Sequence, residues 1–225
     1  MAAVLVDLAH PLRDGMAAYP GLPAARVRPV MTHEASRGSY GGHAEFCLTE
    51  VAFASNTATY LDSPWHRYRD APDIGALPLE AVAALPGVVL DAVVEESDAV
   101  SLPGIASVGA LAGHAVLVRT GWDAHWATDA YWHGPHLSET AVEALVEARP
   151  ALVGVDFANV DDTTDPARPA HSRLLEVGVL VVEHLTRLDQ LPADGFRFHC
   201  VPLAVHGAAS MPVRPYAEVS LGAGS

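Results

Sequence analysis

The chain of 225 residues is half hydrophobic, contains 18 Gly and 17 Pro, and has a formal net charge of −14. This composition is typical of a globular protein rather than a disordered one, and the length suits one sizeable hydrophobic core. The 27 acidic residues outnumber the 13 basic ones, which argues against binding to nucleic acids or anionic membranes, since both need clustered cations.

Strands are predicted where short apolar and β-branched runs are bounded by Gly, Pro or Asp. In chain order these runs are AVLVDL, AEFCLTEVAF, GVVLDAVV, HAVLVRT, LVGVDF, VGVLVVEHL and FRFHCVPLAV. The first apolar run has no basic flank, so it predicts a strand rather than a signal peptide, and we expect a cytoplasmic protein. Continuous apolar runs such as VGVLVV predict a sheet that is covered on both faces.

Three helices are predicted between these strands. The first is LPLEAVAAL. The clearest spans residues 138–148, where apolar residues recur with helical spacing and Glu139 favours the positive end of the helix dipole. The third, HSRLLEVG, is expected to end at Gly178. The pattern predicts an α/β fold in which residues 1–225 form a single domain with a mixed β-sheet flanked by helices.

Three further features receive structural interpretations. Cys47 and Cys200 lie in apolar surroundings and are predicted to be buried thiols. The segment 122–136, rich in Trp and His, is interpreted as a substrate-pocket or subunit-interface loop, with simple packing as the alternative. The acidic residues of VDDTTDP are predicted to be solvated turn-formers.

Ionisable side chains at two places suggest chemistry. Asp62 and His66 flank Pro64 in SNTATYLDSPWHRY, a spacing that on its own is more typical of a turn. Glu183 lies at the end of a buried apolar strand, where a carboxylate is costly unless it is paired or bound to a metal. A Glu at the exposed end of that strand is the alternative. His171 opens the helix that precedes this strand.

The chain resembles the cyclase superfamily, which includes bacterial kynurenine formamidase, isatin hydrolase and aromatic polyketide cyclases. The resemblance covers nearly the whole chain through the segments DLAHPLRDGMAAYPGLP, VLVRTGWDAHW, LVGVDFANVDD, HSRLLEVGVLVVEHLTRLDQLP and VPLAVHGAASMPVRPYA. It implies a kynurenine-formamidase-like fold, a small-molecule substrate and a homo-oligomer.

The family motif H-x-G-T-H-x-D-x-P-x-H aligns on Asp62 and His66, but Asn56 and Tyr60 replace its first two histidines. In the family, those histidines and the Asp bind one metal. The same Asp, a later His and a Glu bind a second, and the final His transfers protons. The resemblance therefore implies Asp62, His171 and Glu183 as metal ligands, if a metal is retained, and His66 as acid/base.

The two replacements weaken the first metal site. An amide oxygen is a poor ligand, and a phenol must lose its proton to bind well, whereas imidazole suits zinc and manganese. We therefore expect no metal, or a single Zn or Mn ion. Hydrolysis in this family needs the metal, whereas ring closure of a carbonyl-rich chain can proceed with a base and an enolate donor.

The interpretation that the sequence favours is ring closure or dehydration of a small carbonyl-rich or aromatic substrate, plausible for polyketide natural-product biosynthesis. His66 would act as base, and Tyr60 or Asn56 would hold the enolate. One alternative is a metal-dependent amide or lactam hydrolase of the kynurenine formamidase type, and another is a non-catalytic ligand-binding homologue. Trp65 and Tyr19 are predicted to contact the substrate, by resemblance to aromatic residues of the family, with a position in the core as the alternative for Trp65.

Overall fold

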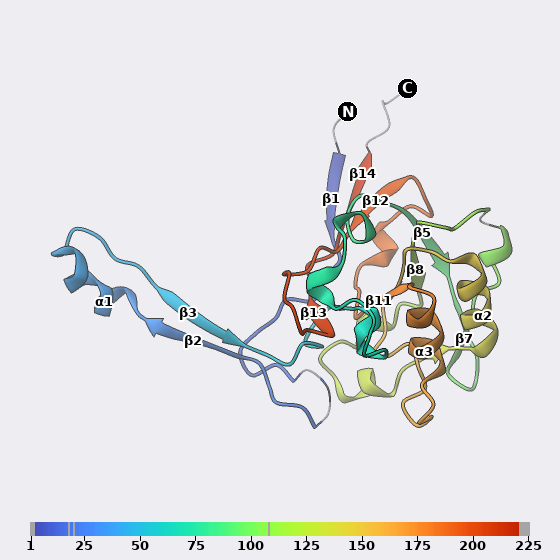
Figure 1. Ribbon diagram of the computed structural model, residues 1–225, viewed down its shortest axis with the longest axis horizontal. Helices are drawn as coiled ribbons and strands as arrows, with labels where there is room; N and C mark the ends of the chain where they lie inside the picture. The colour runs from blue at the N-terminus through green and yellow to red at the C-terminus, as the bar shows by residue number, and fades with distance from the viewer. Residues whose placement is uncertain (1–2, 18, 20, 108, 221–225) are drawn as a thin grey trace.

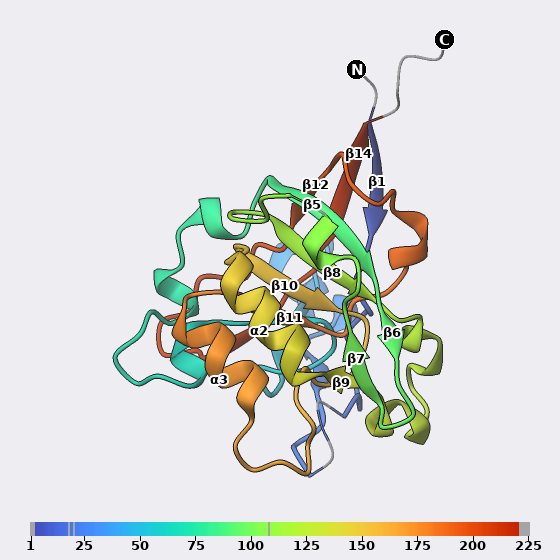
Figure 2. The same cartoon turned by 90° about the vertical axis from the view of Figure 1, so that its right-hand side faces the viewer.

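The computed structural model describes residues 3–17, 19, 21–107 and 109–220. Its main feature is a nine-stranded mixed sheet (Figure 2). In spatial order the strands are β1 (Ala3–Asp7), β14 (Tyr216–Ser220), β12 (Phe196–His199), β5 (Leu85–Asp91), β8 (Ala115–Arg119), β10 (Leu152–Val155), β11 (Leu180–Glu183), β4 (Tyr60–Asp62) and β13 (Ser210–Pro212). The four central strands from β5 to β11 run parallel, and the outer ones pair antiparallel. All seven predicted strand runs contribute strands, so the predicted α/β fold with a mixed sheet is confirmed.

Two helices, α2 (Glu139–Ala148) and α3 (Pro169–Glu176), lie side by side on one face of this sheet (Figures 1 and 2). Ser138 caps α2 by accepting a hydrogen bond from the backbone N–H of Ala141, and Gly178 follows α3 with a φ of +81°. Alternate residues along the central strands contribute to two buried clusters, one on each face, as the continuous apolar runs predict. The second face is covered by loops and short helices instead of long ones.

The predicted helix LPLEAVAAL is wrong. Only Leu79–Ala81 forms a short 3₁₀ helix there, and β5 begins at Leu85, so the apolar residues after Ala84 belong to a strand. Ala84 itself adopts a left-handed conformation with φ of 54°, which cannot continue a helix. The other 3₁₀ helices are Arg37–Tyr40, Pro64–His66, Ile74–Ala76, Ile105–Ser107, Trp122–His125, Asp129–His133 and Leu188–Gln190. No helix in the described ranges is long and apolar enough to cross a membrane.

Two smaller sheets complete the molecule. One contains the short strands β6 (Val93–Val94), β7 (Ala99–Ser101) and β9 (His136–Leu137). The other is the hairpin of β2 (Arg26–Met31) and β3 (Leu48–Ala52), whose tip holds α1 (His33–Ser36). Figure 1 shows this hairpin projecting away from the main sheet as an arm. Cys47 lies on the arm and is exposed, because the apolar residues around it do not join a core; Cys200 is buried as predicted.

Candidate metal and active site

Strands β4 and β11 place three polar side chains beside one another. They pair antiparallel, with Tyr60 opposite Glu183 and Asp62 opposite Val181. Because side chains alternate along a strand, Tyr60, Asp62 and Glu183 point to the same face of the sheet. Glu183 is 0 % exposed, so it lies fully inside the protein and not at an exposed strand end.

His171 completes a group of three candidate ligands on this face. It lies in α3, and its Nε2 is 3.5 Å from Oδ2 of Asp62 and 3.6 Å from Oε1 of Glu183. One donor atom from each of the three residues lies within 4.8 Å of the others. Two carboxylates and one imidazole at such spacing can surround one divalent cation and leave further coordination positions open.

The surroundings of the Asp62 carboxylate indicate whether a cation fits between the three candidate ligands. Asp62 is 0 % exposed, and within the described residues neither of its oxygens accepts a hydrogen bond. A buried carboxylate without donors is costly, and a bound cation removes that cost. Together with the nearby His171 and Glu183, the donor set fits a single zinc or manganese ion.

Asp161 contacts His171 on the side of the imidazole that faces away from Asp62 and Glu183, and the sequence interpretation missed it. Its Oδ2 lies 2.6 Å from Nδ1 of His171, and its carboxylate also accepts the backbone N–H groups of Ala170 and His171 at the start of α3. Asp161 is 3 % exposed, so the prediction that the acidic residues of VDDTTDP are solvated is wrong for this one. With Nδ1 donating to Asp161, Nε2 of a neutral His171 is the nitrogen that can bind a metal.

Without a cation, a proton compensates the clustered negative charge. Burial would lower the pKa of His171, but the charge of Glu183 and the contacts with Asp161 and Asp62 raise it to about 10. Burial raises the pKa of Glu183 to about 7, and the neighbouring Asp62 adds to this effect. Burial opposes ionisation of Asp62 as well, but the imidazoles of His171 and His66 lower its pKa overall. The site therefore attracts positive charge.

Tyr60 and Asn56, which the sequence interpretation aligns with the first two histidines of the motif, differ in their contacts. The Tyr60 hydroxyl donates a hydrogen bond to Oε2 of Glu183, while the backbone N–H of Val160 donates to Oε1 over 2.7 Å. Burial first, and then the charge of Glu183, raises the pKa of Tyr60 well above its usual value, so this phenol stays protonated. Asn56 is half-buried and faces the same cavity.

His66 lies at the open side of the group, with a side chain that is 36 % exposed. Its Nδ1 is 3.6 Å from Oδ1 of Asp62 and 3.5 Å from Oγ of Ser210. Burial lowers the pKa of His66, and the nearby His171 and Arg67 oppose its protonation further, whereas Asp62 acts in the other direction. A neutral imidazole beside the candidate ligands can accept a proton.

A cavity of about 250 Å³ opens over the group. Its lining contains the predicted residues Tyr19, Asn56, Tyr60, His66 and His171, together with Arg67, Asn159 and Arg168, which the sequence interpretation missed. Trp65 does not belong to this lining. Its indole N–H instead donates to the backbone carbonyl of Arg69 over 2.9 Å.

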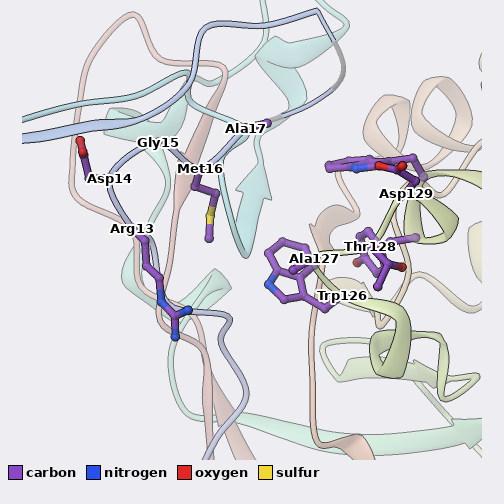
Figure 3. A pocket seen from close by; sticks show the side chains of 11 residues that line it. Arg13, Asp14, Gly15, Met16, Ala17, Trp126, Ala127, Thr128 and Asp129 are labelled. Carbon is purple, nitrogen blue, oxygen red and sulfur yellow. The ribbon is translucent and has the colours of Figure 1, made fainter.

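The aromatic segment 122–136 lines a second pocket, of about 350 Å³, next to this cavity. Figure 3 shows Met16 and Trp126 extending into the pocket from opposite walls. Trp132 also lines it and contacts Tyr19 edge to face, with ring centroids 5.3 Å apart. His10, in which the sequence shows no pattern, stacks on Trp126 with ring centroids 3.9 Å apart. The segment therefore both packs against the core and borders a pocket.

Comparison with known proteins decides the family. A family model described as putative cyclase matches residues 6–162. The chain belongs to this family. Among curated relatives, the kynurenine formamidase of Salinibacter ruber is 26% identical over 212 residues, which cover 93% of this chain and 95% of the relative. The kynurenine formamidase of Bordetella petrii is 28% identical over 171 residues, covering 74% of this chain and 78% of the relative.

Solved structures of similar fold agree with this placement. Isatin hydrolase A from Labrenzia aggregata, bound to benzyl benzoate, superposes with a TM-score of 0.81 and 24% identity, covering 97% of this chain and 94% of that one. A potential metal-dependent hydrolase with cyclase activity gives a TM-score of 0.75 at 20% identity, covering 98% of this chain and 100% of that one. At these identities the likeness concerns the fold, and the predicted cyclase-superfamily membership is confirmed by the family match.

Proposed function

We propose that this family member is a hydrolase of amide or lactam bonds that uses one divalent cation, zinc or manganese. The observation that carries the proposal is the fully buried Asp62 carboxylate, which lacks hydrogen-bond donors in the described structure and lies beside His171 and Glu183. The curated relatives named kynurenine formamidase support hydrolysis over the ring closure that the sequence interpretation favoured.

Asp62, Glu183 and Nε2 of His171 would hold the cation, and Asp161 would orient the imidazole. A cation held by these residues would supply polarisation of the substrate carbonyl and a lowered pKa for a water molecule. His66 then accepts the proton of the attacking water. Its Nδ1 faces Asp62 at 3.6 Å and contacts Oγ of Ser210, so Nε2 is the nitrogen that would exchange the proton.

The neighbouring pocket supports a substrate with an apolar or aromatic group next to the scissile bond. Met16, Trp126 and Trp132 offer a flat apolar lining, and Trp132 reaches the catalytic cavity through its contact with Tyr19. The cavity also contains Arg67 and Arg168, which can hold a carbonyl or carboxylate oxygen of the same substrate.

Ring closure is the second candidate, because His66 alone can supply a base to an acidic methylene group. One contact weakens it. The Tyr60 hydroxyl that would stabilise an enolate already donates to Glu183, so only Asn56 of the two replacements remains available for that role.

Metal analysis combined with two assays tests the proposal. Purified wild-type protein is loaded with zinc or manganese, dialysed, and assayed for metal content and for hydrolysis of an N-formyl aromatic amide and of isatin. We expect one cation per chain and hydrolysis that a chelator abolishes. His171→Ala should lose both the cation and at least about a hundredfold in activity, since a ligand is removed.

The matched control is His206→Ala, which removes a histidine whose side chain is 84% exposed and outside the site. It should retain the cation and full activity. Ring closure of a β-dicarbonyl substrate that persists after chelation, with no hydrolysis, would overturn the proposal. So would tight ligand binding by a metal-free protein without any turnover.

A further inference from the structure

A third cavity, of about 480 Å³, lies where the segments that follow β1, β11 and β13 meet. It shares no lining residue with the catalytic cavity or with the pocket that Trp126 lines. Two arginines, Arg187 and Arg214, and one histidine, His10, line it together with a single acidic residue, Asp7. In a chain with 27 acidic and 13 basic residues, such an excess of basic side chains favours an anion. We call this space the basic cavity.

The Asp7 carboxylate neutralises only one of the two arginines. It accepts hydrogen bonds from Nε and Nη2 of Arg214 over 3.1 and 2.8 Å, and a third from the backbone N–H of Ala9. The arginine ion pairs within the described part of the chain do not include Arg187. Burial opposes the ionisation of Asp7, but Arg214, Ala9 and, to a smaller extent, Arg187 lower its pKa overall. The charge of Arg187 therefore acts in the basic cavity without a carboxylate of its own.

The backbone of Arg187 is fixed in a conformation that is rare for residues other than glycine. Its φ is 58°, in the left-handed region. Oδ2 of Asp123 accepts the N–H of Arg187 over 3.1 Å and the hydroxyl of Thr186 over 2.7 Å, and so stabilises this turn. Backbone strain of this kind often occurs at ligand-binding positions, which agrees with a role for the Arg187 side chain in binding.

His10 offers a second donor to the same space. Its Nε2 is buried and has no hydrogen-bond partner among the described residues, although buried polar atoms are usually paired. Burial lowers the pKa of His10 to about 4; Asp123 opposes this shift and Arg187 adds to it. The imidazole is therefore neutral near pH 7, and with its proton on Nε2 it can donate a hydrogen bond to an anion.

The remaining lining indicates what kind of anion fits. Pro11, Leu12, Pro212 and Val213 give the basic cavity apolar walls, which favour a ligand with an apolar body over a bare inorganic ion. A planar carboxylate matches the parallel N–H donors of the Arg187 guanidinium.

We propose that the basic cavity is a binding site for a small organic carboxylate, separate from the catalytic cavity. The carboxylate pairs with the guanidinium of Arg187 and accepts a hydrogen bond from Nε2 of His10, while the apolar body contacts Leu12 and Val213. His10 also stacks on Trp126, which lines the pocket beside the catalytic cavity. A ligand that fixes the imidazole of His10 therefore also restrains one wall of that pocket.

Isothermal titration of the full-length, metal-free chain with phenylacetate tests the proposal. We expect saturable binding that Arg187→Gln weakens about ten- to a hundredfold, because a charged hydrogen-bond donor is lost. His10→Phe retains a ring that can stack on Trp126 but removes Nε2, and it should weaken binding about tenfold. Melting temperatures show that both variants remain folded.

The matched control is Arg168→Gln. Arg168 has a left-handed φ of 48° and directly precedes α3, as Arg187 directly precedes the 3₁₀ helix Leu188–Gln190, but it lines the catalytic cavity. Its substitution should leave the affinity for phenylacetate unchanged. A loss of affinity in Arg168→Gln without any in Arg187→Gln would place the ligand in the catalytic cavity and overturn the proposal.

Inorganic phosphate, titrated in parallel, separates an organic carboxylate from a bare anion. Phosphate binding that depends on Arg187, with no binding of phenylacetate, overturns the proposal. Absence of phenylacetate binding at millimolar concentration overturns it as well. Binding is measured without metal and without turnover, so its failure is separate from any failure of the hydrolase proposal.

Discussion

Asp62 and Glu183 are both fully buried carboxylates of the same site, yet their surroundings differ. Glu183 accepts hydrogen bonds from Tyr60 and from the backbone N–H of Val160. Asp62, two residues from Tyr60 along β4, accepts none within the described structure. Tyr60 thus satisfies one carboxylate and leaves the other without a donor. The difference teaches that two carboxylates of one site attract a cation unequally, because only Asp62 lacks hydrogen-bond donors.

The comparison divides the site into two halves. The retained half contains Asp62, His171 and Glu183 with Asp161 and His66 around them, and the substituted half contains Asn56 and Tyr60. If this division is correct, changes in the retained half should affect catalysis or metal binding strongly, and changes in the substituted half should affect mainly stability.

The largest of the remaining effects is expected at His66. His66→Gln should lower kcat about 10²–10⁴-fold, because it removes the group that accepts the proton. Metal content and melting temperature should stay at wild-type values. His206→Gln is the matched control, and unchanged turnover in His66→Gln would remove His66 from the mechanism.

The pH profile of the wild-type enzyme also tests the role of His66 as the proton acceptor. The pKa of His66 is lowered from its ordinary value of 6.5, by burial first. The neutral form that accepts protons therefore persists as the pH falls below 6.5, and the acidic limb of kcat/KM should lie below that value. An acidic limb well above pH 6.5 would contradict this assignment.

A smaller effect is expected from Asp161, which contacts His171 but is not one of the three candidate ligands. Asp161→Asn should weaken metal affinity about 10–100-fold, measured by isothermal titration, because the imidazole loses the carboxylate that orients it. Asp156→Asn provides the control, since Asp156 is equally buried but binds the backbone N–H groups of Thr120 and Gly121 instead. Equal loss of affinity in both variants would show that only general stability is involved.

The smallest effect is expected from Tyr60 in the substituted half. Tyr60→Phe leaves one buried oxygen of Glu183 without a donor and should lower the free energy of unfolding of the metal-free protein by about 1–3 kcal/mol. The metal stoichiometry should remain one per chain. Tyr131→Phe is the control, because the buried Tyr131 hydroxyl has no partner in the described chain. Loss of the cation in Tyr60→Phe would show that the Tyr60 phenol is a metal ligand. The distinction between the retained and the substituted half of the site would then be wrong.

Much of the fold could be predicted from the sequence, because the central strands are long apolar runs between turn residues. The strands β4 and β13 could not, since each has three residues and its strand character comes from pairing with a neighbour. The prediction of a helix at LPLEAVAAL was wrong for a related reason, because pairing in the sheet overrides the local pattern. Its apolar spacing suits a helix, but the residues from Leu85 onward pair with β8 and β12 in the sheet.

The sequence drew attention to the ionisable residues of the candidate site, but their grouping into one site was predictable only through the resemblance to the family. The motif identified Asp62, His66, His171 and Glu183, which the structure brings to one place. Asp161 was missed because an acidic residue in VDDTTDP has the composition of a turn, and its bond to His171 arises only when α3 folds back beside it. Arg168 was missed too. It immediately precedes α3 and has a left-handed backbone with φ of 48°, a local conformation that the sequence does not indicate for an arginine.

The antiparallel pairing of β4 with β11 has one more consequence. If β4 were displaced by a single position, Leu61 would occupy the place of a carboxylate, and Tyr60 and Asp62 would turn toward the opposite core. Such a misaligned molecule could still be compact, but it would be unable to take up an ion. Ion binding would then distinguish molecules with the correct register between β4 and β11 from molecules in which this register is shifted.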